Sequence, residues 1–310
     1  MLVLIVGLGS IAIKHIHAVR SIDENSTIYA LRSSKESILF DGIINLYSEG
    51  EIPVEIDFAI VCNPTQMHFE TIAKLSKLRV PLFIEKPPLH TILRSERLVS
   101  LLDERKIITY IACNLRFHPC VKFIKEYLQT NHNRVNEVNV YCGSYLPDWR
   151  PEKNFRDVYS ASEVLGGGVH LDLYHEMDYA VWLFGTPHSN KGYRSSESSL
   201  GLDSSDYANY LLNYKGFNLS IILNYYRRKP KRSMEIVFKD STVTVDLISN
   251  KVITDMGVII FASEEYNIMS SYIDQMRYFI KCIKSEKKPM NDFNEALEIL
   301  KLCLKNEALS

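Results

Sequence analysis

Short apolar runs alternate with amphipathic stretches over residues 1–118. Each run is nearly all apolar, which is typical of a strand covered by helices on both faces. Five strands are predicted in this way, at Leu2–Val6, Thr27–Leu31, Phe58–Cys62, Leu82–Ile84 and Ile108–Ala112. The stretches between them predict helices at Ser10–Ile22, His68–Leu78 and Leu93–Arg105. This alternation indicates βαβ units on a parallel sheet and therefore an α/β fold.

The pattern changes after Pro119. Alternating polarity, with turn residues between the runs, predicts strands at Glu137–Gly143, Ala208–Tyr214, Leu219–Tyr226, Met234–Phe238 and Thr242–Ile248. Helices are predicted at Val121–Leu128, at Val169–Leu183 and, as a pair, between Tyr272 and Leu304. We therefore expect two domains, 1–118 and 119–310.

Composition narrows the class of protein. Of the 310 residues, 46% are hydrophobic and 24% are charged, as in ordinary globular enzymes. The net charge of −1 provides no basic field for nucleic acid or for an anionic membrane, and no run of about 20 apolar residues predicts a transmembrane helix. Six cysteines without CxxC pairs or metal-ligand spacing predict free thiols, a cytoplasmic location and no metal site.

A glycine-rich turn, Gly7-Leu8-Gly9-Ser10-Ile11-Ala12, follows the first predicted strand. Gly7 permits the tight turn, Gly9 lets the backbone approach a pyrophosphate, and Ala12 permits close packing of helix on strand. The helix that begins with Ser10 and Ile11 presents free N–H groups and the positive end of its dipole to the phosphates. The position of this motif between a strand and a helix predicts a dinucleotide site.

The second predicted strand ends without the acidic residue that usually bonds the ribose hydroxyls of NAD. It is followed by Arg32-Ser33-Ser34-Lys35. A guanidinium and two hydroxyls suit a 2′-phosphate, because arginine pairs well with phosphate oxygens. The sequence therefore favours NADP(H) as cofactor, with NAD(H) as the alternative. A solvated turn with a surface arginine is the structural alternative.

Two more segments follow predicted strands. Asn63-Pro64-Thr65-Gln66-Met67-His68 ends the third strand, where we expect it beside the nicotinamide ribose; for His68 a structural role is favoured over a catalytic one. Ile84-Glu85-Lys86-Pro87-Pro88 ends the fourth. A lysine at the carboxyl end of a parallel strand faces the crevice where such sheets bind ligands, and there it can exchange a proton with a substrate.

In the second half of the chain, Gly166-Gly167-Gly168 precedes a predicted helix that carries Asp172, His175 and Asp178 on one face. A histidine between carboxylates can be held in one tautomer and can act as an acid or a base. A hydrogen-bonded structural group is the alternative for such a trio.

Together, these segments resemble the Gfo/Idh/MocA family of nicotinamide-dependent oxidoreductases. The resemblance rests on the GxGxxA turn, the NPT-xx-H segment, the EKP motif, Asn114-Leu115-Arg116-Phe117 and the glycine–Asp–His helix. It implies an N-terminal Rossmann domain that binds the cofactor, with Glu85, Asn114 and Arg116 among its contacts. It also implies a C-terminal α/β domain for substrate binding, whose open, mainly antiparallel sheet forms the interface of a homodimer or homotetramer.

The resemblance further implies that Lys86 and His175 flank the substrate carbinol or carbonyl, and that the Lys86–Pro87 bond is cis, as is frequent in the family. One spacing departs from the family pattern. Three residues usually separate the aspartate from the histidine, whereas here only two lie between Asp172 and His175. The role of Asp172 is therefore open between catalysis and orientation of His175.

The loop from Ser144 to Tyr159 combines aromatic rings with arginines, and its candidate substrate residues are Trp149, Arg150, Arg156 and Tyr159. Such side chains suit a sugar ring that carries phosphate or carboxylate. The loop also resembles that of family members associated with surface-sugar biosynthesis. A subunit-contact loop is an equal alternative. Arg227, Arg228 and Arg232 either contribute to the same anion site or form a solvated strand end.

We thus expect an NAD(P)-dependent oxidoreductase that transfers a hydride between nicotinamide and a carbon of a sugar or nucleotide sugar. Lys86, His175 and Asp172 are the predicted catalytic residues, and the latter two also belong to the predicted substrate site. A non-catalytic dinucleotide- and sugar-binding regulatory protein is one alternative. The presence of both Lys86 and His175 argues against it, because a binding protein needs no proton donor. A free-polyol dehydrogenase of the inositol type is another, although a neutral polyol gives the arginines no charge partner.

Overall fold

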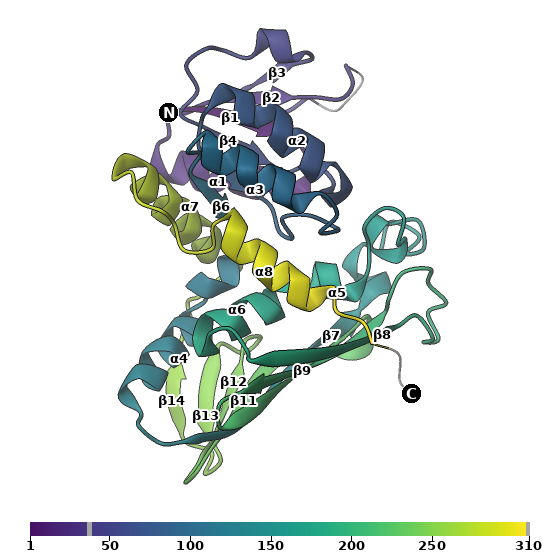
Figure 1. Ribbon diagram of the computed structural model, residues 1–310, viewed down its shortest axis with the longest axis vertical. Helices are drawn as coiled ribbons and strands as arrows, with labels where there is room; N and C mark the ends of the chain where they lie inside the picture. Colours follow the sequence, from purple (N-terminus) through teal and green to yellow (C-terminus); the bar gives the residue numbers. More distant parts are fainter. Residues whose placement is uncertain (36–38, 308–310) are drawn as a thin grey trace. The chain divides into compact units, whose positions relative to one another are not determined.

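The computed structural model describes residues 1–35 and 39–307. The chain divides into two compact units (Figure 1). The first unit contains residues 1–114 and 267–298, and the second contains residues 115–266 and the described residues from 299 onward. Each unit is therefore built from two separate stretches of the chain.

Sheet A of the first unit consists of six parallel strands in the order β3-β2-β1-β4-β5-β6. The strands are β1 (Leu2–Val6), β2 (Thr27–Leu31), β3 (Ile43–Leu46), β4 (Phe58–Val61), β5 (Leu82–Ile84) and β6 (Thr109–Ile111). The predicted parallel Rossmann sheet is confirmed. The sequence did not predict β3, because this four-residue edge strand is interrupted by the polar Asn45. The strand order reverses between β1 and β4, where sheets of this kind bind ligands.

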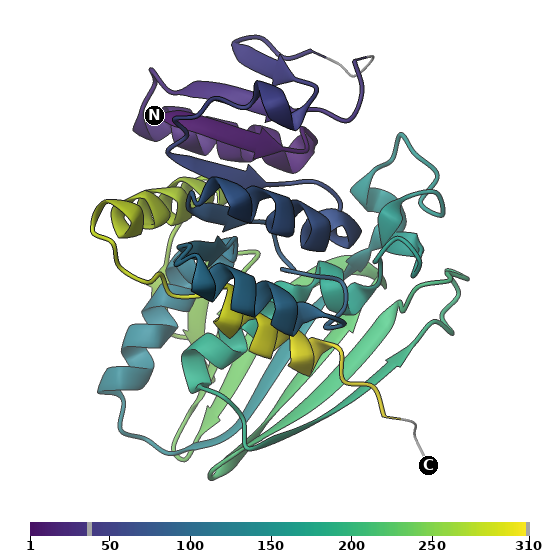
Figure 2. The same cartoon turned by 45° about the horizontal axis from the view of Figure 1, so that its top comes forward.

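The helices of the first unit are α1 (Ser10–Ile22), α2 (His68–Leu75), α3 (Ser95–Glu104), α7 (Ile268–Lys284) and the start of α8 (Phe293–Cys303). Helix α1 packs against α7, and α2 packs against α3 (Figure 2). The ring of Phe279 on α7 lies 5.4 Å from the rings of Phe58 and Phe83. The late segment of the chain therefore completes the core over sheet A.

Sheet B of the second unit has eight strands in the order β14-β13-β12-β11-β7-β10-β9-β8. Its neighbours are antiparallel except for β7 and β10, so the predicted mainly antiparallel sheet is confirmed. The strands are β7 (Val135–Tyr145), β8 (Ser189–Ser195), β9 (Tyr207–Tyr214), β10 (Phe217–Asn224), β11 (Tyr226–Phe238), β12 (Thr242–Asp246), β13 (Lys251–Thr254) and β14 (Ile259–Ala262). The sequence predicted only the second half of β11, because its first half is a run of basic residues without apolar alternation.

The helices that begin in the second unit are α4 (Pro119–Thr130), α5 (Val169–Asp172) and α6 (Tyr174–Phe184), and α4 and α6 lie on the same face of sheet B (Figure 1). The prediction of one continuous helix over Val169–Leu183 is wrong. The helix is interrupted at Leu173, whose φ of −97° and ψ of 35° are not helical. Leucine is a good helix former, so the sequence carries no local signal for this break. Asp172 and His175 consequently lie on different helices.

Six short 3₁₀ helices complete the described elements: η1 (Glu49–Glu51), η2 (Thr65–Met67), η3 (Ser76–Leu78), η4 (Asn114–Phe117), η5 (Leu146–Trp149) and η6 (Tyr159–Ala161). Over the described part of the chain, no helix combines the length and apolar character needed to cross a membrane. All six cysteines are buried and none forms a disulfide.

Candidate cofactor and substrate sites

The predicted cofactor residues of the first unit follow five strands of sheet A. Because these strands are parallel, their carboxyl ends share one edge of the sheet, and the fold brings the residues to that edge. Gly7, Gly9, Ser10 and Ile11 follow β1; Arg32 and Ser33 follow β2; Asn63, Pro64, Thr65 and His68 follow β4; Glu85 and Lys86 follow β5; and Asn114 follows β6.

The turn between β1 and α1 leaves a helix end open to a phosphate. Gly7 has a φ of +88°, and a Cβ there would lie 2.5 Å from the backbone nitrogen of Asn63, so only glycine fits. At Gly9, which precedes α1, a Cβ would meet no atom within 4 Å. No side chain caps the first turn of α1. Its N–H groups and dipole therefore fit the pyrophosphate of a nicotinamide dinucleotide.

The segment after β2 carries two positioned cations. The Arg32 guanidinium donates a hydrogen bond of 2.8 Å to Oδ1 of Asn45, a residue of the neighbouring strand β3. The Lys35 ammonium lies 5.6 Å from the centre of the Tyr47 ring. Ser33 is exposed beside them. Arg32, Ser33 and Lys35 thus combine positive charge with a hydroxyl at the end of the second strand. In a Rossmann sheet this is the position that binds the adenosine ribose.

The segments after β4 and β5 are held together by buried side chains. The two ring nitrogens of His68 lie 3.1 Å from the carbonyl oxygen of Pro88 and 3.0 Å from that of Asn63. The Glu85 carboxylate contacts His15 at 2.5 Å and accepts a hydrogen bond of 3.1 Å from the backbone nitrogen of Lys86. The Lys86–Pro87 peptide bond is cis, as the resemblance implied.

The Asn114-Leu115-Arg116-Phe117 motif divides between the two units. The Asn114 side chain donates to the Ser271 hydroxyl at 2.9 Å within the first unit. Arg116 belongs to the second unit, where its guanidinium makes two hydrogen bonds to the Asp178 carboxylate, at 2.7 and 3.0 Å. Both side chains of this ion pair are 0% exposed. Asp178 is therefore engaged with Arg116.

Asp172 is bonded by two tyrosines. The hydroxyl of Tyr159 donates to Oδ1 at 2.7 Å, and that of Tyr225 donates to Oδ2 at 2.5 Å. The charge of Asp172 and burial raise the pKa of Tyr159 well above its usual value; burial and Asp172 do the same for Tyr225. Both phenols therefore remain protonated and donate to a carboxylate that is itself buried.

His175 lies in the first turn of α6 and is partly exposed. The helix is anchored on either side of it in sequence. Glu176 is fully buried and accepts two hydrogen bonds from Arg232 of β11, at 2.6 and 3.2 Å. Asp178 holds Arg116 as described above. Two ion pairs, one fully buried and one partly buried, thus fix the helix that presents His175. The contact with Glu176 also shows that Arg232 is not a solvated strand end.

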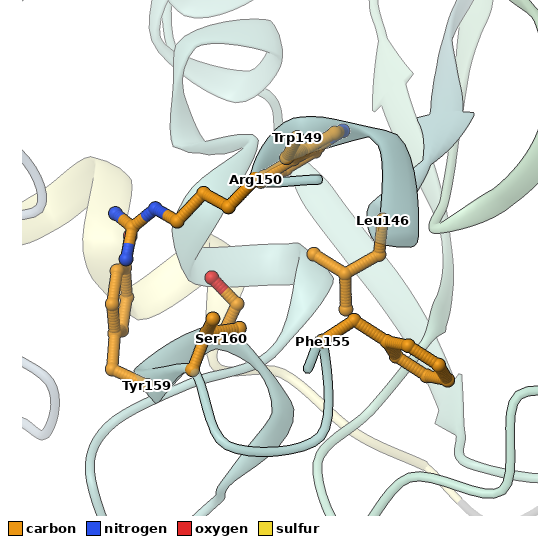
Figure 3. Close-up of a pocket in the computed structure, with 7 residues that line it drawn as sticks. Leu146, Trp149, Arg150, Phe155, Tyr159 and Ser160 are labelled. Carbon is orange, nitrogen blue, oxygen red and sulfur yellow. The ribbon is translucent and has the colours of Figure 1, made fainter. Parts of the chain in front are cut away.

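A pocket beside Asp172 is formed within the second unit (Figure 3). It brings together three of the predicted substrate residues, Trp149, Arg150 and Tyr159. Its lining is completed by Leu146, Phe155, Val158 and Ser160. The Arg150 guanidinium lies 5.9 Å from the Tyr159 ring, and the Trp149 ring lies 5.4 Å from that of Tyr225. Arg156 is directed elsewhere, since it donates to the carbonyl oxygen of Leu200 at 2.9 Å.

Two residues of these sites were missed from the sequence. His15 is fully buried on the face of α1 that also buries Ala12, Ile16 and Val19, and a polar residue on this apolar face was a usable signal. Tyr225 reaches Asp172 from the end of β10, a contact 53 positions apart in the chain. Local sequence carries no signal for such a contact.

A second buried histidine predicts a specific pH dependence of stability. Nε2 of His170 lies 2.5 Å from the Arg194 guanidinium, and burial together with that charge lowers the pKa of His170 from 6.5 to about 3. The unfolded chain therefore binds this proton below about pH 6.5, whereas the folded chain does not until about pH 3. We expect up to about 5 kcal/mol of unfolding free energy to be lost as the pH falls through this window.

His170→Gln is the matched variant, because its amide oxygen still accepts from Arg194 but does not titrate. Urea unfolding between pH 7 and pH 4 should show a smaller loss of stability in the variant than in the wild type. Equal losses would show that His170 does not contribute.

Comparisons with known proteins agree with this architecture. Residues 1–112 match the oxidoreductase family with an NAD-binding Rossmann fold, Gfo/Idh/MocA. Myo-inositol 2-dehydrogenase of Thermotoga maritima is 23% identical over 92% of this chain and 89% of its own. The structure of levoglucosan dehydrogenase with NADH and levoglucosan has a TM-score of 0.84 at 14% identity, covering 98% of this chain and 95% of that one. That of the WlbA dehydrogenase from Bordetella pertussis with NADH and UDP-GlcNAcA has a TM-score of 0.80 at 17% identity, covering 97% and 93%.

The sheet order, the open helix end and the family match define a nicotinamide-dinucleotide-binding oxidoreductase. More specifically, residues 1–112 match the Gfo/Idh/MocA family, which supports the resemblance seen in the sequence.

Proposed function

We propose that this protein transfers a hydride between NADP(H) and the carbinol or carbonyl carbon of an anionic sugar, such as a nucleotide-linked or acidic sugar. The observation that carries the proposal is the placement of Lys86 directly after β5, on the same sheet edge as the open N-terminus of α1. That edge is where sheets of this order bind ligands, so a proton-transfer group and a pyrophosphate site share it.

When bound, the nicotinamide cofactor would supply or take up the hydride of the proposed reaction. Lys86 exchanges the proton on the reacting oxygen, a role that a positioned lysine side chain can fill as general acid or base. His175 polarises the same oxygen or relays the proton. Asp172, held by two tyrosine hydroxyls, fixes the end of α5 and orients a substrate hydroxyl. The rigid anchoring of α6 supports this assignment for His175.

The lining of the pocket supports an anionic sugar. Aromatic faces bind the apolar faces of sugar rings, and Arg150 offers a charge partner for carboxylate or phosphate. Arg150 lies beside Tyr159, whose hydroxyl donates to Asp172, and this link supports a substrate that contacts both residues. A role in surface-polysaccharide biosynthesis would agree with such a substrate.

A preference for NADP(H) is supported by Arg32, held by Asn45, and by the absence of an acidic residue among the four residues directly after β2. We expect NADPH to bind more tightly than NADH in a fluorescence titration. Arg32→Ala should weaken NADPH binding about 10- to 100-fold and change NADH binding little, because only the former loses a charge-assisted bond. Arg97→Ala, at an exposed arginine of α3, is the control. Tighter binding of NADH by the wild type would make NAD(H) the cofactor.

A free-polyol dehydrogenase is the second candidate, and it is favoured by the likeness to myo-inositol 2-dehydrogenase along most of the chain. The two candidates differ in what Arg150 does. An anionic substrate needs it, whereas a neutral polyol has no charge to pair with it. The relative turnover of anionic and neutral sugars separates the two.

We further propose that the protein is cytoplasmic and forms a homodimer or homotetramer through the face of sheet B opposite α4 and α6. The cysteines are buried and form no disulfide, which supports a reducing compartment. On β9 every second residue faces away from the buried side, and among these Leu211 is 48% exposed. Light scattering on the purified protein measures the assembly, and a monomer at all concentrations would rule out this interface.

A further inference from the structure

Two buried histidines bracket the segment that carries Lys86. His15 of α1 is 0% exposed and His68, the first residue of α2, is 1% exposed. His15 contacts the side chain of Glu85, immediately before Lys86. His68 contacts the carbonyl oxygen of Pro88, two residues after it. All of these residues belong to the first unit.

The contact before Lys86 is a short pair within the core. Nε2 of His15 and Oε1 of Glu85 are 2.5 Å apart, and the other carboxylate oxygen accepts from the backbone nitrogen of Lys86. The His15 ring is itself packed against Phe83 at 4.9 Å and Tyr272 at 5.5 Å. The carboxylate therefore links a rigid helix to the backbone of Lys86. The same helix presents its open N-terminus to the cofactor site.

The contact after Lys86 joins two segments. The His68 ring lies between the carbonyl oxygens of Pro88 and Asn63, so it ties the turn after β5 to the segment after β4. An imidazole has one N–H when neutral and two when protonated, so it can bond at least one of these carbonyls in either state. Proline lacks an N–H, so Pro87 and Pro88 give this turn no backbone donor of their own.

We propose that His15 and His68 are positioning residues of the reaction, which hold the two ends of the Glu85–Pro88 turn and thereby fix Lys86 at the sheet edge. This inference rests on the proposed function of Lys86. In this role Glu85, itself held by His15, holds the backbone of Lys86 in place. His68 likewise has an indirect role, through the backbone on which the lysine is carried.

Loss of either contact should displace Lys86 without removing the cofactor site. A displacement of about 1 Å at a reacting group can lower a rate about 100-fold. We therefore expect His15→Leu, which keeps the ring's bulk but makes no hydrogen bond, to lower kcat about 10- to 100-fold. The dissociation constant for NADPH and the KM for substrate should change by less than about threefold, because the groups that bind them are retained. His68→Leu should lower kcat by a similar factor.

The test needs a readout of Lys86 that does not depend on turnover. Competitive acetylation of the folded protein with acetic anhydride, followed by mass spectrometry, measures the reactivity of Lys86 relative to the exposed Lys77. We expect this ratio to rise several-fold in His15→Leu and His68→Leu. It should stay near the wild-type value in His15→Gln, whose amide can still donate to Glu85, and in the control His17→Ala, an exposed residue of the same helix.

An unchanged Lys86 ratio in both folded leucine variants would overturn the proposal. A ratio in His15→Gln that rises despite a folded protein would also overturn it, even if the leucine variants fail to fold. Failure of the proposed function is a separate result, since it would appear as full turnover by Lys86→Ala. The labelling ratio would still decide whether the histidines position the lysine.

Discussion

Replacing Lys86 with alanine should lower kcat by about 10²- to 10⁴-fold while leaving NADPH binding near the wild-type value. The reason is that a positioned proton donor typically contributes this factor, whereas the open end of α1 is untouched. Lys86→Arg gives a sharper comparison. Arginine keeps the positive charge but does not release its proton at neutral pH, so it should be nearly as inactive as alanine.

The matched control is Lys77→Ala, which removes an exposed lysine of the first unit. Turnover is followed by the absorbance of the reduced nicotinamide, and cofactor binding by fluorescence titration. Activity of Lys86→Arg close to the wild type would mean that the lysine acts as a charge, not as a proton carrier. Loss of NADPH binding in Lys86→Ala would make it a cofactor residue.

The second large effect concerns the buried pair of Arg116 and Asp178. Asp178→Ala should lower the free energy of unfolding by about 3–5 kcal/mol, because it leaves the guanidinium in the core without its carboxylate. Urea unfolding followed by tryptophan fluorescence measures this unit directly, since both tryptophans, Trp149 and Trp182, lie in it.

Two variants check the cause of that effect. Arg116→Met combined with Asp178→Leu removes both charges and should recover most of the stability, because apolar side chains can replace a buried ion pair. Lys305→Ala removes a surface pair with a nitrogen–oxygen separation of 3.8 Å and should leave the unfolding midpoint nearly unchanged. A midpoint for Asp178→Ala equal to that of Lys305→Ala would refute the structural role of the pair.

Local sequence patterns predict much of the secondary structure of the first unit. Apolar runs and the glycine turn predicted β1, α1 and β2 at their observed bounds, because each element is specified by its own period and by the turn residues that bound it. The resemblance of the sequence to a known family correctly implied two further features, the cis Lys86–Pro87 bond and the mainly antiparallel character of sheet B.

What the sequence could not supply depends on contacts between distant segments. Asp172 seemed paired with His175 on one helix, but the helix is interrupted at Leu173, and tyrosines from two other segments bond the carboxylate. Asp178 accepts two hydrogen bonds from Arg116, 62 positions away, a contact that no local pattern indicates. Side-chain pairs of this kind are decided by packing, which periodicity does not encode.

In the proposed function, this chain oxidises or reduces an anionic sugar with Lys86 as the proton carrier. The most direct measurement is the change in nicotinamide absorbance with a nucleotide-linked uronic acid and, in parallel, with myo-inositol, using wild-type protein and Lys86→Ala. The account predicts turnover of the uronic acid well above that of the polyol, and its collapse in the variant. Faster turnover of myo-inositol, or equal rates for wild type and variant, would contradict it.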